Sequence, residues 1–120
     1  MKSNSDSRET RRTLEEQRMV LSERIADAEH RLGVPIEPSP DRLDLTQSRI
    51  SRERSAILLA ESKQLLDQIE AALRRIDDGS YGTCAACGEE IMPTRLRAIP
   101  YASLCIRCQT RQEEKVSVNL

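Results

Sequence analysis

The chain contains no tryptophan and no phenylalanine, and it has only two tyrosines among its 120 residues. Because large aromatic side chains usually fill the core of a globular domain, their scarcity argues against a deep core. Charged residues make up 32% of the chain. This combination predicts one small domain or a domain with an extension, built from long solvated helices that bury a narrow apolar stripe.

Long apolar runs and an excess of basic charge are also missing. The longest aliphatic stretch, Ile57 to Ala60, is far too short to span a bilayer, and residues 1–16 contain no secretory signal. We therefore expect a cytoplasmic protein that does not enter membranes. Binding to nucleic acid usually requires a basic surface and stacking side chains, and a chain of net charge −1 with two aromatic residues offers neither.

Catalytic arrangements are absent from the sequence as well. The single histidine, His30, has no serine or cysteine arrangement that would pair a nucleophile with a base. No glycine-rich phosphate-binding loop is found. We expect a protein that is not an enzyme, with no catalytic residues.

Two stretches carry apolar residues at alternating spacings of four and three, as in the seam of a coiled coil. The first runs from about residue 8 to residue 32, with a predicted seam at Leu14, Arg18, Leu21, Ile25, Ala28 and Leu32. The second runs from near residue 41 to about residue 78, with a predicted seam at Leu58, Ser62, Leu65, Ile69, Ala72 and Ile76. Ile50 and Ile57 lie one residue out of this register, which we interpret as a drift of the seam.

A short breaker segment separates the two predicted helices. Gly33 is a plausible C-cap, and prolines at positions 35, 38 and 40 prevent one helix from running through. The fold class is therefore predicted as mainly α: a long antiparallel coiled-coil hairpin followed by a small domain whose four cysteines, in residues 84–108, predict a zinc finger. We expect residues 1–78 to form the N-terminal segment and hairpin, with its tip at about 33–46, and residues 79–120 to form the zinc finger and a C-terminal helix.

Four cysteines provide the clearest chemical signal in the sequence. Their spacing, C-x2-C-x17-C-x2-C, is typical of a zinc site with ligands Cys84, Cys87, Cys105 and Cys108. Four thiolates leave no open coordination position, so the predicted ion is structural and not catalytic. A redox dithiol, a disulfide pair and a rubredoxin-like iron site are the alternatives, and a reducing compartment disfavours the disulfide.

Two acidic residues stand directly after the proline-rich bend. Asp41 is placed as an N-cap and Asp44 as the acidic partner of a capping box, and spacing alone favours this structural role. The alternative is that the hairpin carries two carboxylates at its far end in order to present them to a partner in a deep channel.

The cysteine region closely resembles the DksA/TraR family of bacterial transcription regulators, which bind RNA polymerase. The residues that carry this resemblance are Ala72 to Ile91 (ALRRIDDGSYGTCAACGEEI), Arg95 to Pro100 (RLRAIP) and Leu104 to Cys108 (LCIRC). They cover about forty residues with high specificity, and the hairpin extends the resemblance by architecture. The N-terminal extension of longer family members is expected to be missing.

The resemblance implies a function for the tip. Members of the family insert their coiled coil into the secondary channel of RNA polymerase, and their tip carries the motif Asp-x-x-Asp-x-Ala. Asp41 and Asp44 match this motif, whereas Thr46 stands at the alanine position. The resemblance therefore favours a functional tip, formed by Asp41, Asp44 and Thr46, in a monomeric regulator of the stringent-response type.

A second departure concerns the alarmone (p)ppGpp. Responsive family members have basic residues at the positions of Gln68, Ile99 and Gln109, and none of these is basic here. An anionic ligand would lose its charge-assisted partners, so we expect a weak response or none at that site. Three other interpretations of the chain stay open: a zinc-stabilised interaction module with a different partner, a redox-sensing regulator and, least favoured, a DNA-binding zinc ribbon.

Overall fold

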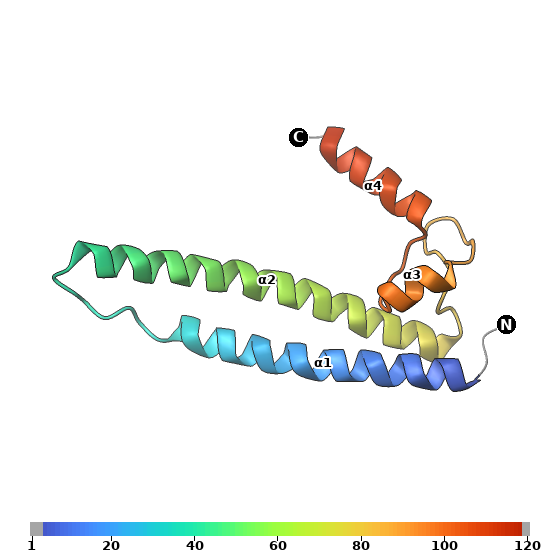
Figure 1. Ribbon diagram of the computed structural model, residues 1–120, viewed down its shortest axis with the longest axis horizontal. Coiled ribbons are helices and arrows are strands. Elements are labelled where there is room, and N and C mark those ends of the chain that lie inside the picture. Colours follow the sequence, from blue (N-terminus) through green and yellow to red (C-terminus); the bar gives the residue numbers. More distant parts are fainter. Residues whose placement is uncertain (1–3, 119–120) are drawn as a thin grey trace. The chain divides into compact units, whose positions relative to one another are not determined.

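Four helices follow one another in the computed structural model, which describes residues 4–118 (Figure 1). They are α1 (Asn4–Gly33), α2 (Arg42–Asp78), α3 (Pro93–Ala98) and α4 (Ile106–Val118). Extended pairing within this range is limited to an isolated bridge between Thr83 and Glu90. The mainly α fold predicted from the sequence is confirmed. None of the helices in residues 4–118 combines the length and the apolar character that a membrane span requires.

The chain forms two compact units. The first joins the chain up to Glu16 with the chain from Gln68 onward, and the second comprises Gln17–Asp67. The base of the hairpin thus belongs to the same unit as the cysteine region. The predicted domain boundary between residues 78 and 79 coincides with the end of α2. That the two predicted domains fold independently stays a prediction.

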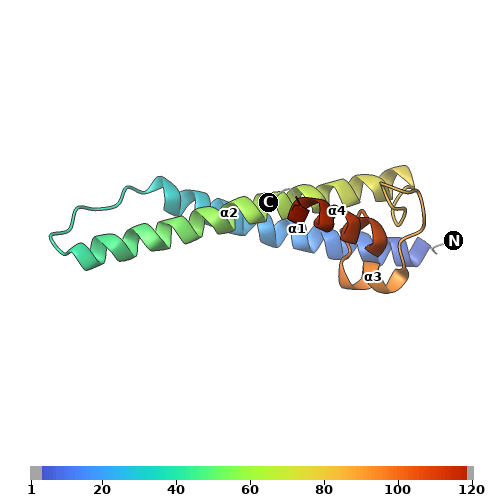
Figure 2. The same ribbon diagram turned by 90° about the horizontal axis from the view of Figure 1, so that it is seen from above.

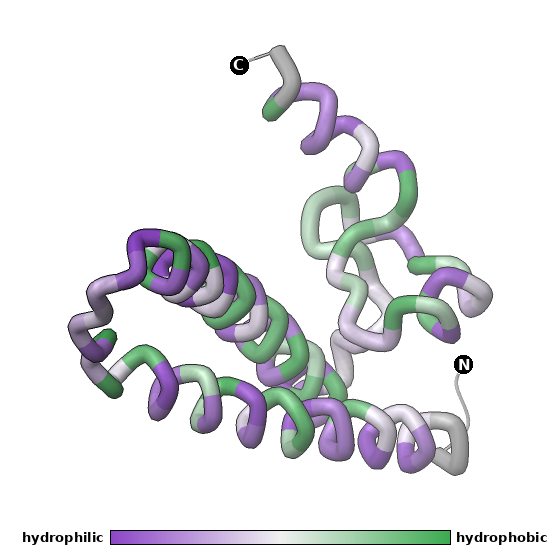
Figure 3. Tube along the Cα trace, turned by 60° about the vertical axis from the view of Figure 1, so that its left-hand side comes forward, coloured by the Kyte–Doolittle hydropathy of each residue, from purple (hydrophilic) through white to green (hydrophobic). Residues whose placement is uncertain are grey.

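In the second unit, the C-terminal part of α1 and the N-terminal part of α2 run side by side in opposite directions (Figures 1 and 2). An extended connection of residues 34–41 joins them. Leu21 and Ile25 on α1 are buried, with 6% and 9% of their surface exposed. Arg18, which was predicted in the seam, is exposed, and Gln17 is half-buried instead. Figure 3 shows apolar and polar residues alternating along both helices, as expected for one narrow apolar stripe.

The register of α2 differs from the prediction toward its N-terminus. Toward the C-terminus the predicted positions Ser62, Leu65, Ile69, Ala72 and Ile76 are half-buried or buried, as are Leu66 and Leu73 beside them. Toward the N-terminus the less exposed residues are instead Arg52, Ser55 and Leu59. Leu58, predicted in the seam, is 60% exposed, and Ile50 and Ile57 are 45% and 59% exposed. The prediction was wrong at Leu58 because its neighbour Leu59 is equally apolar and takes the less exposed position, and because the polar residues Arg52 and Ser55, which continue the stripe, give no hydrophobic signal.

In the first unit, the paired helix segments bury their largest apolar side chains. Leu14 on α1 is fully buried, as are Ile69 and Ala72 on α2, with at most 1% exposure. Arg11 and Asp77 connect the two helices through an ion pair of 2.5 Å between Nη2 and Oδ1. Because both partners are well exposed, we assign the stability of this pairing mainly to the apolar contacts.

The ends of the helices show which local signals operate. α2 ends in a glycine turn: Gly79 has a φ of 83°, and the amides of Ser80 and Tyr81 both donate to the carbonyl of Arg75. Gly33 ends α1 as predicted, but it is not among the left-handed glycines, which are Gly79, Gly82 and Gly88. α1 also begins at Asn4, earlier than the expected start near residue 8; residues 1–3 lie outside the described range.

Replacing Leu14 by alanine is expected to lower the free energy of unfolding by roughly 2–5 kcal/mol, because it leaves a cavity in the fully buried part of the seam. Leu58→Ala is the matched control and should change it by less than about 0.5 kcal/mol, since that side chain is exposed. Urea unfolding followed by circular dichroism measures both. Equal losses in the two variants would contradict the observed register.

Candidate functional site

The first cysteine pair lies on a turn that glycine makes possible. The amide of Gly88 donates to the carbonyl of Cys84 at 3.0 Å, and Gly88 has a φ of 77°. Only glycine adopts this backbone conformation without strain, so any side chain at this position would strain the turn. The amide of Cys84 donates to the carbonyl of Glu89 at 2.7 Å, which closes the turn on itself. Cys84 and Cys87 are consequently presented on one short loop.

The second cysteine pair lies at the start of α4. The amide of Gln109 donates to the carbonyl of Cys105, so Cys105 takes the N-cap position and Cys108 falls in the first helical turn. Backbone N–H groups and the helix dipole favour negative charge at this end of a helix. A further hydrogen bond of 2.8 Å, from the amide of Ala85 to the carbonyl of Ser103, connects the two cysteine loops.

All four sulfur atoms converge. The Sγ atoms of Cys84, Cys87, Cys105 and Cys108 lie within 4.8 Å of one another, and those of Cys87 and Cys105 are 3.8 Å apart. A tetrahedron with zinc–sulfur bonds of about 2.3 Å has sulfur–sulfur edges of about 3.8 Å. A disulfide would require about 2.0 Å between two sulfurs. The arrangement therefore fits a zinc ion and not a disulfide.

Backbone amides favour the thiolate form of two of the ligands. The N–H of Cys105, with those of Cys87 and Ala86, points to the Cys84 sulfur and lowers its pKa to about 6. The N–H of Cys108 lowers the pKa of Cys105 in the same way. The pKa of Cys108 is raised to about 12, chiefly by side-chain hydrogen bonds with Cys105 and Cys84, which favour its protonated form. A bound divalent ion would favour the thiolate form of this ligand as well.

A very small core surrounds the sulfurs. Its fully packed members are Cys84, Ile91, Leu96, Ala102 and Cys108, so two of the five are themselves metal-ligand candidates. Leu96 comes from α3, a helix that the sequence analysis missed. Pro93 at its first turn was the available signal. The Arg95 side chain donates to the carbonyl of Leu104 at 3.0 Å, and the Tyr81 hydroxyl donates to that of Pro100 at 2.8 Å.

At the tip, the capping role of Asp41 is confirmed, whereas the predicted capping box is not formed. The Oδ1 atom of Asp41 accepts the N–H of Leu43 at 2.9 Å, as an N-cap does. The N–H of Asp41 itself donates to the Ser39 hydroxyl at 3.2 Å, in the place where a capping box would use Asp44. Both acidic residues are exposed, and neither takes part in the two ion pairs found over residues 4–118.

Thr46 uses its polar group within the helix. Its Oγ1 atom donates to the carbonyl of Arg42, four residues earlier, at 2.9 Å. Threonine often makes this bond within a helix, and here the bond occupies the hydroxyl hydrogen. The methyl group is the other part of the side chain beyond Cβ. The threonine therefore differs less from alanine at this position than its hydroxyl suggests.

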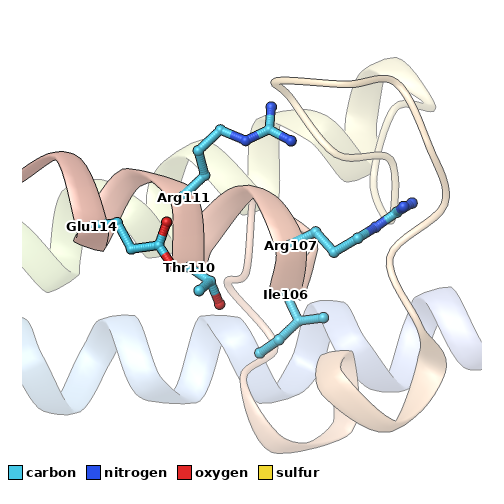
Figure 4. Close-up of a pocket in the computed structure, with 5 residues that line it drawn as sticks. All are labelled: Ile106, Arg107, Thr110, Arg111 and Glu114. Carbon is cyan, nitrogen blue, oxygen red and sulfur yellow. The ribbon is translucent and has the colours of Figure 1, made fainter.

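A shallow depression on α4 offers no comparable site. It is lined by Ile106, Arg107, Thr110, Arg111 and Glu114, all from the same helix. Figure 4 shows that the side chains of Arg107 and Arg111 point in different directions, away from that of Glu114. Charged groups that diverge in this way cannot surround one ligand.

The comparisons with known proteins agree with these observations. A family model, the prokaryotic dksA/traR C4-type zinc finger, matches residues 79–114. The solved structure of transcription factor DksA2 from Pseudomonas aeruginosa is 35% identical, with a TM-score of 0.78, and the match covers 96% of this chain and 88% of that one. The chain belongs to the DksA/TraR family. As a C4-type member of this family with four clustered cysteines, it carries one structural zinc ion.

Two further relatives match smaller parts of their own length. The RNA polymerase-binding transcription factor DksA of Caulobacter vibrioides is 35% identical over 83 residues, which is 69% of this chain and 58% of the relative. A protein of Aquifex aeolicus is 33% identical over 104 residues, or 85% of this chain and 72% of the relative. This chain thus spans only part of the length of its curated relatives.

Removal of zinc is expected to unfold residues 79–118, because metal binding contributes roughly 10–16 kcal/mol to the folding of comparable zinc-finger peptides. The helical signal of the second unit, Gln17–Asp67, should persist. Nuclear magnetic resonance of isotope-labelled protein, before and after chelation, measures both effects residue by residue. Zinc added back should restore the lost signals, whereas unchanged spectra in the metal-free protein would contradict a structural role.

Proposed function

We propose that this protein is a non-enzymatic regulator of transcription that binds bacterial RNA polymerase and inserts its helical hairpin into the secondary channel. The observation that carries the proposal is the likeness to DksA2, which extends over 96% of the chain at 35% identity. The Caulobacter relative is named for binding RNA polymerase. Direct binding to specific DNA sequences is not part of the proposal, because the net charge is −1 and stacking residues are scarce.

The hairpin tip supplies the acting groups in this proposal. Asp44 is exposed and does not cap the helix, so both its oxygens are available to a partner. Asp41 uses Oδ1 for the cap and keeps its second oxygen available. Two carboxylates near a catalytic centre that depends on bound cations would change the local potential strongly, since electrostatic effects grow where water is excluded. Asp41 and Asp44 would therefore act by charge, with no chemistry of their own.

The zinc-binding region has the complementary role in the proposal. Its fold rests on the metal and on a core of five residues, and it presents α4 on its surface. A rigid element of this kind suits contact with the outer surface of a large enzyme. In this proposal the protein acts as a monomer.

The double substitution Asp41→Asn, Asp44→Asn is expected to reduce regulation of initiation at least tenfold, because it removes both tip charges. Asparagine caps helices as well as aspartate, so the free energy of unfolding should change by less than about 0.5 kcal/mol. In vitro transcription with purified polymerase and zinc-loaded protein measures the regulation. Asp27→Asn, Asp67→Asn is the matched control, since both residues are exposed acids of the hairpin helices that lie outside the tip, Asp27 on α1 and Asp67 on α2.

Two results would contradict the proposal. If the protein fails to bind core polymerase at micromolar concentration, an interaction module with another partner becomes the better interpretation. If the tip variant regulates as well as the control variant does, the tip charges have no role in regulation.

The response to (p)ppGpp is expected to be weak or absent at the site used by responsive family members. Gln109 lies half-buried and its amide donates to Glu113 at 3.1 Å, and Ile99 packs against the small core of the zinc-binding region. Neither offers a cation to a phosphate. Binding of labelled alarmone to polymerase, measured with and without this protein, provides the test. A clear gain that depends on the protein would contradict the expectation.

A further inference from the structure

One long-range contact within the second unit concerns the tip directly. Arg52, on α2, reaches the end of α1, where its Nη1 atom donates to the carbonyl of Val34 at 2.7 Å and its Nη2 atom donates to the carbonyl of Leu32. Building on the function proposed above, we propose that Arg52 is a positioning residue: its two hydrogen bonds fix the proline-rich connection and thereby present the tip carboxylates in one arrangement.

The end of α1 explains why an arginine is needed there. The last carbonyls of a helix have no partners within the helix, and a left-handed glycine often satisfies them. Gly33 does not adopt that conformation, and the single local bond, from the Val34 amide to the Arg31 carbonyl, is long at 3.3 Å. The planar guanidinium group of Arg52 can donate to two carbonyls at once, and its charge suits the negative end of a helix dipole.

The connection has few other contacts. Val34 and Ile36 are 51% and 37% exposed, and three prolines in residues 34–41 have no amide hydrogen to donate. The remaining hydrogen bonds of this segment over the described residues are local, such as that between the Asp41 amide and the Ser39 hydroxyl. Arg52 is the one side chain from beyond residues 31–45 that forms a hydrogen bond to this segment within the described chain.

Arg52 and the connection that it contacts both line a groove of about 660 Å³. Val34 and Ile36 line it from the connection, and Asp44 and Arg52 line it from α2. The wall that faces Asp44 is therefore the segment that Arg52 holds in place. Without these bonds the connection would sample many conformations, and each docking event would have to order it again. The concentration of protein needed for regulation would rise, although the maximal effect at saturation would be kept.

Arg52→Gln tests the inference, with Arg54→Gln as the matched control, because Arg54 is exposed on the same helix and loses the same charge. Amide hydrogen exchange of the isolated protein reports on residues 32–45, and titration in the transcription assay gives both the half-maximal concentration and the maximal effect. For Arg52→Gln we expect about tenfold faster exchange in this segment and a half-maximal concentration about five- to tenfold higher. For Arg52→Lys both the exchange rate and the half-maximal concentration should lie between those of Arg52→Gln and the native protein, since an ammonium group keeps the charge without the planar fork.

The inference is overturned if Arg52→Gln behaves like Arg54→Gln in either measurement, or if it lowers the maximal effect and leaves the half-maximal concentration unchanged. A failure of the proposed function would appear elsewhere. It would show as normal regulation by the Asp41→Asn, Asp44→Asn protein, which retains Arg52.

Discussion

The fold of the C-terminal part of this chain depends on four cysteine sulfur atoms that lie close enough together to bind one zinc ion. The apolar side chains fully packed around them are three in number, Ile91, Leu96 and Ala102, which is far too few to order some forty residues. The zinc ion therefore takes the place of a hydrophobic core. The glycine turn at Gly88, the short helix α3 and the start of α4 all serve to bring the ligands together.

The hairpin is stabilised differently, by packing along its apolar stripe. Its stripe contains Ser55, Ser62 and Arg52 among the apolar residues, so burial alone gives a modest preference for one register. Large buried side chains such as Leu14 and Ile69 fix the helices in the first unit. In the second unit, the arginine contact at the end of α1 adds a directional constraint that apolar packing cannot supply, because hydrogen bonds require defined donors and acceptors.

At the tip, the capping role of Asp41 is compatible with the function proposed above. Asp41 stabilises the start of α2 through one oxygen, and its own N–H donates to the Ser39 hydroxyl, in place of the Asp44 carboxylate that would accept this hydrogen bond in a capping box. Because the serine accepts this hydrogen bond, the Asp44 side chain is not used in the cap. A carboxylate that is exposed and has no ion pair in the described chain contributes little to stability, which is consistent with the role in partner contact proposed above.

The sequence by itself determined the features that depend on local chemistry. Cysteine spacing specified the zinc site because the two short turns need only nearby residues, and the heptad pattern with the prolines specified two antiparallel helices. Only the tertiary structure decided which face of α2 is covered, why Leu58 is exposed and what Arg52 binds. The covered face of α2 depends on which side chains of α1 pack against it, and the Arg52 contact depends on backbone carbonyls 18 and 20 residues away in the chain. No residue pattern records the position of a carbonyl group.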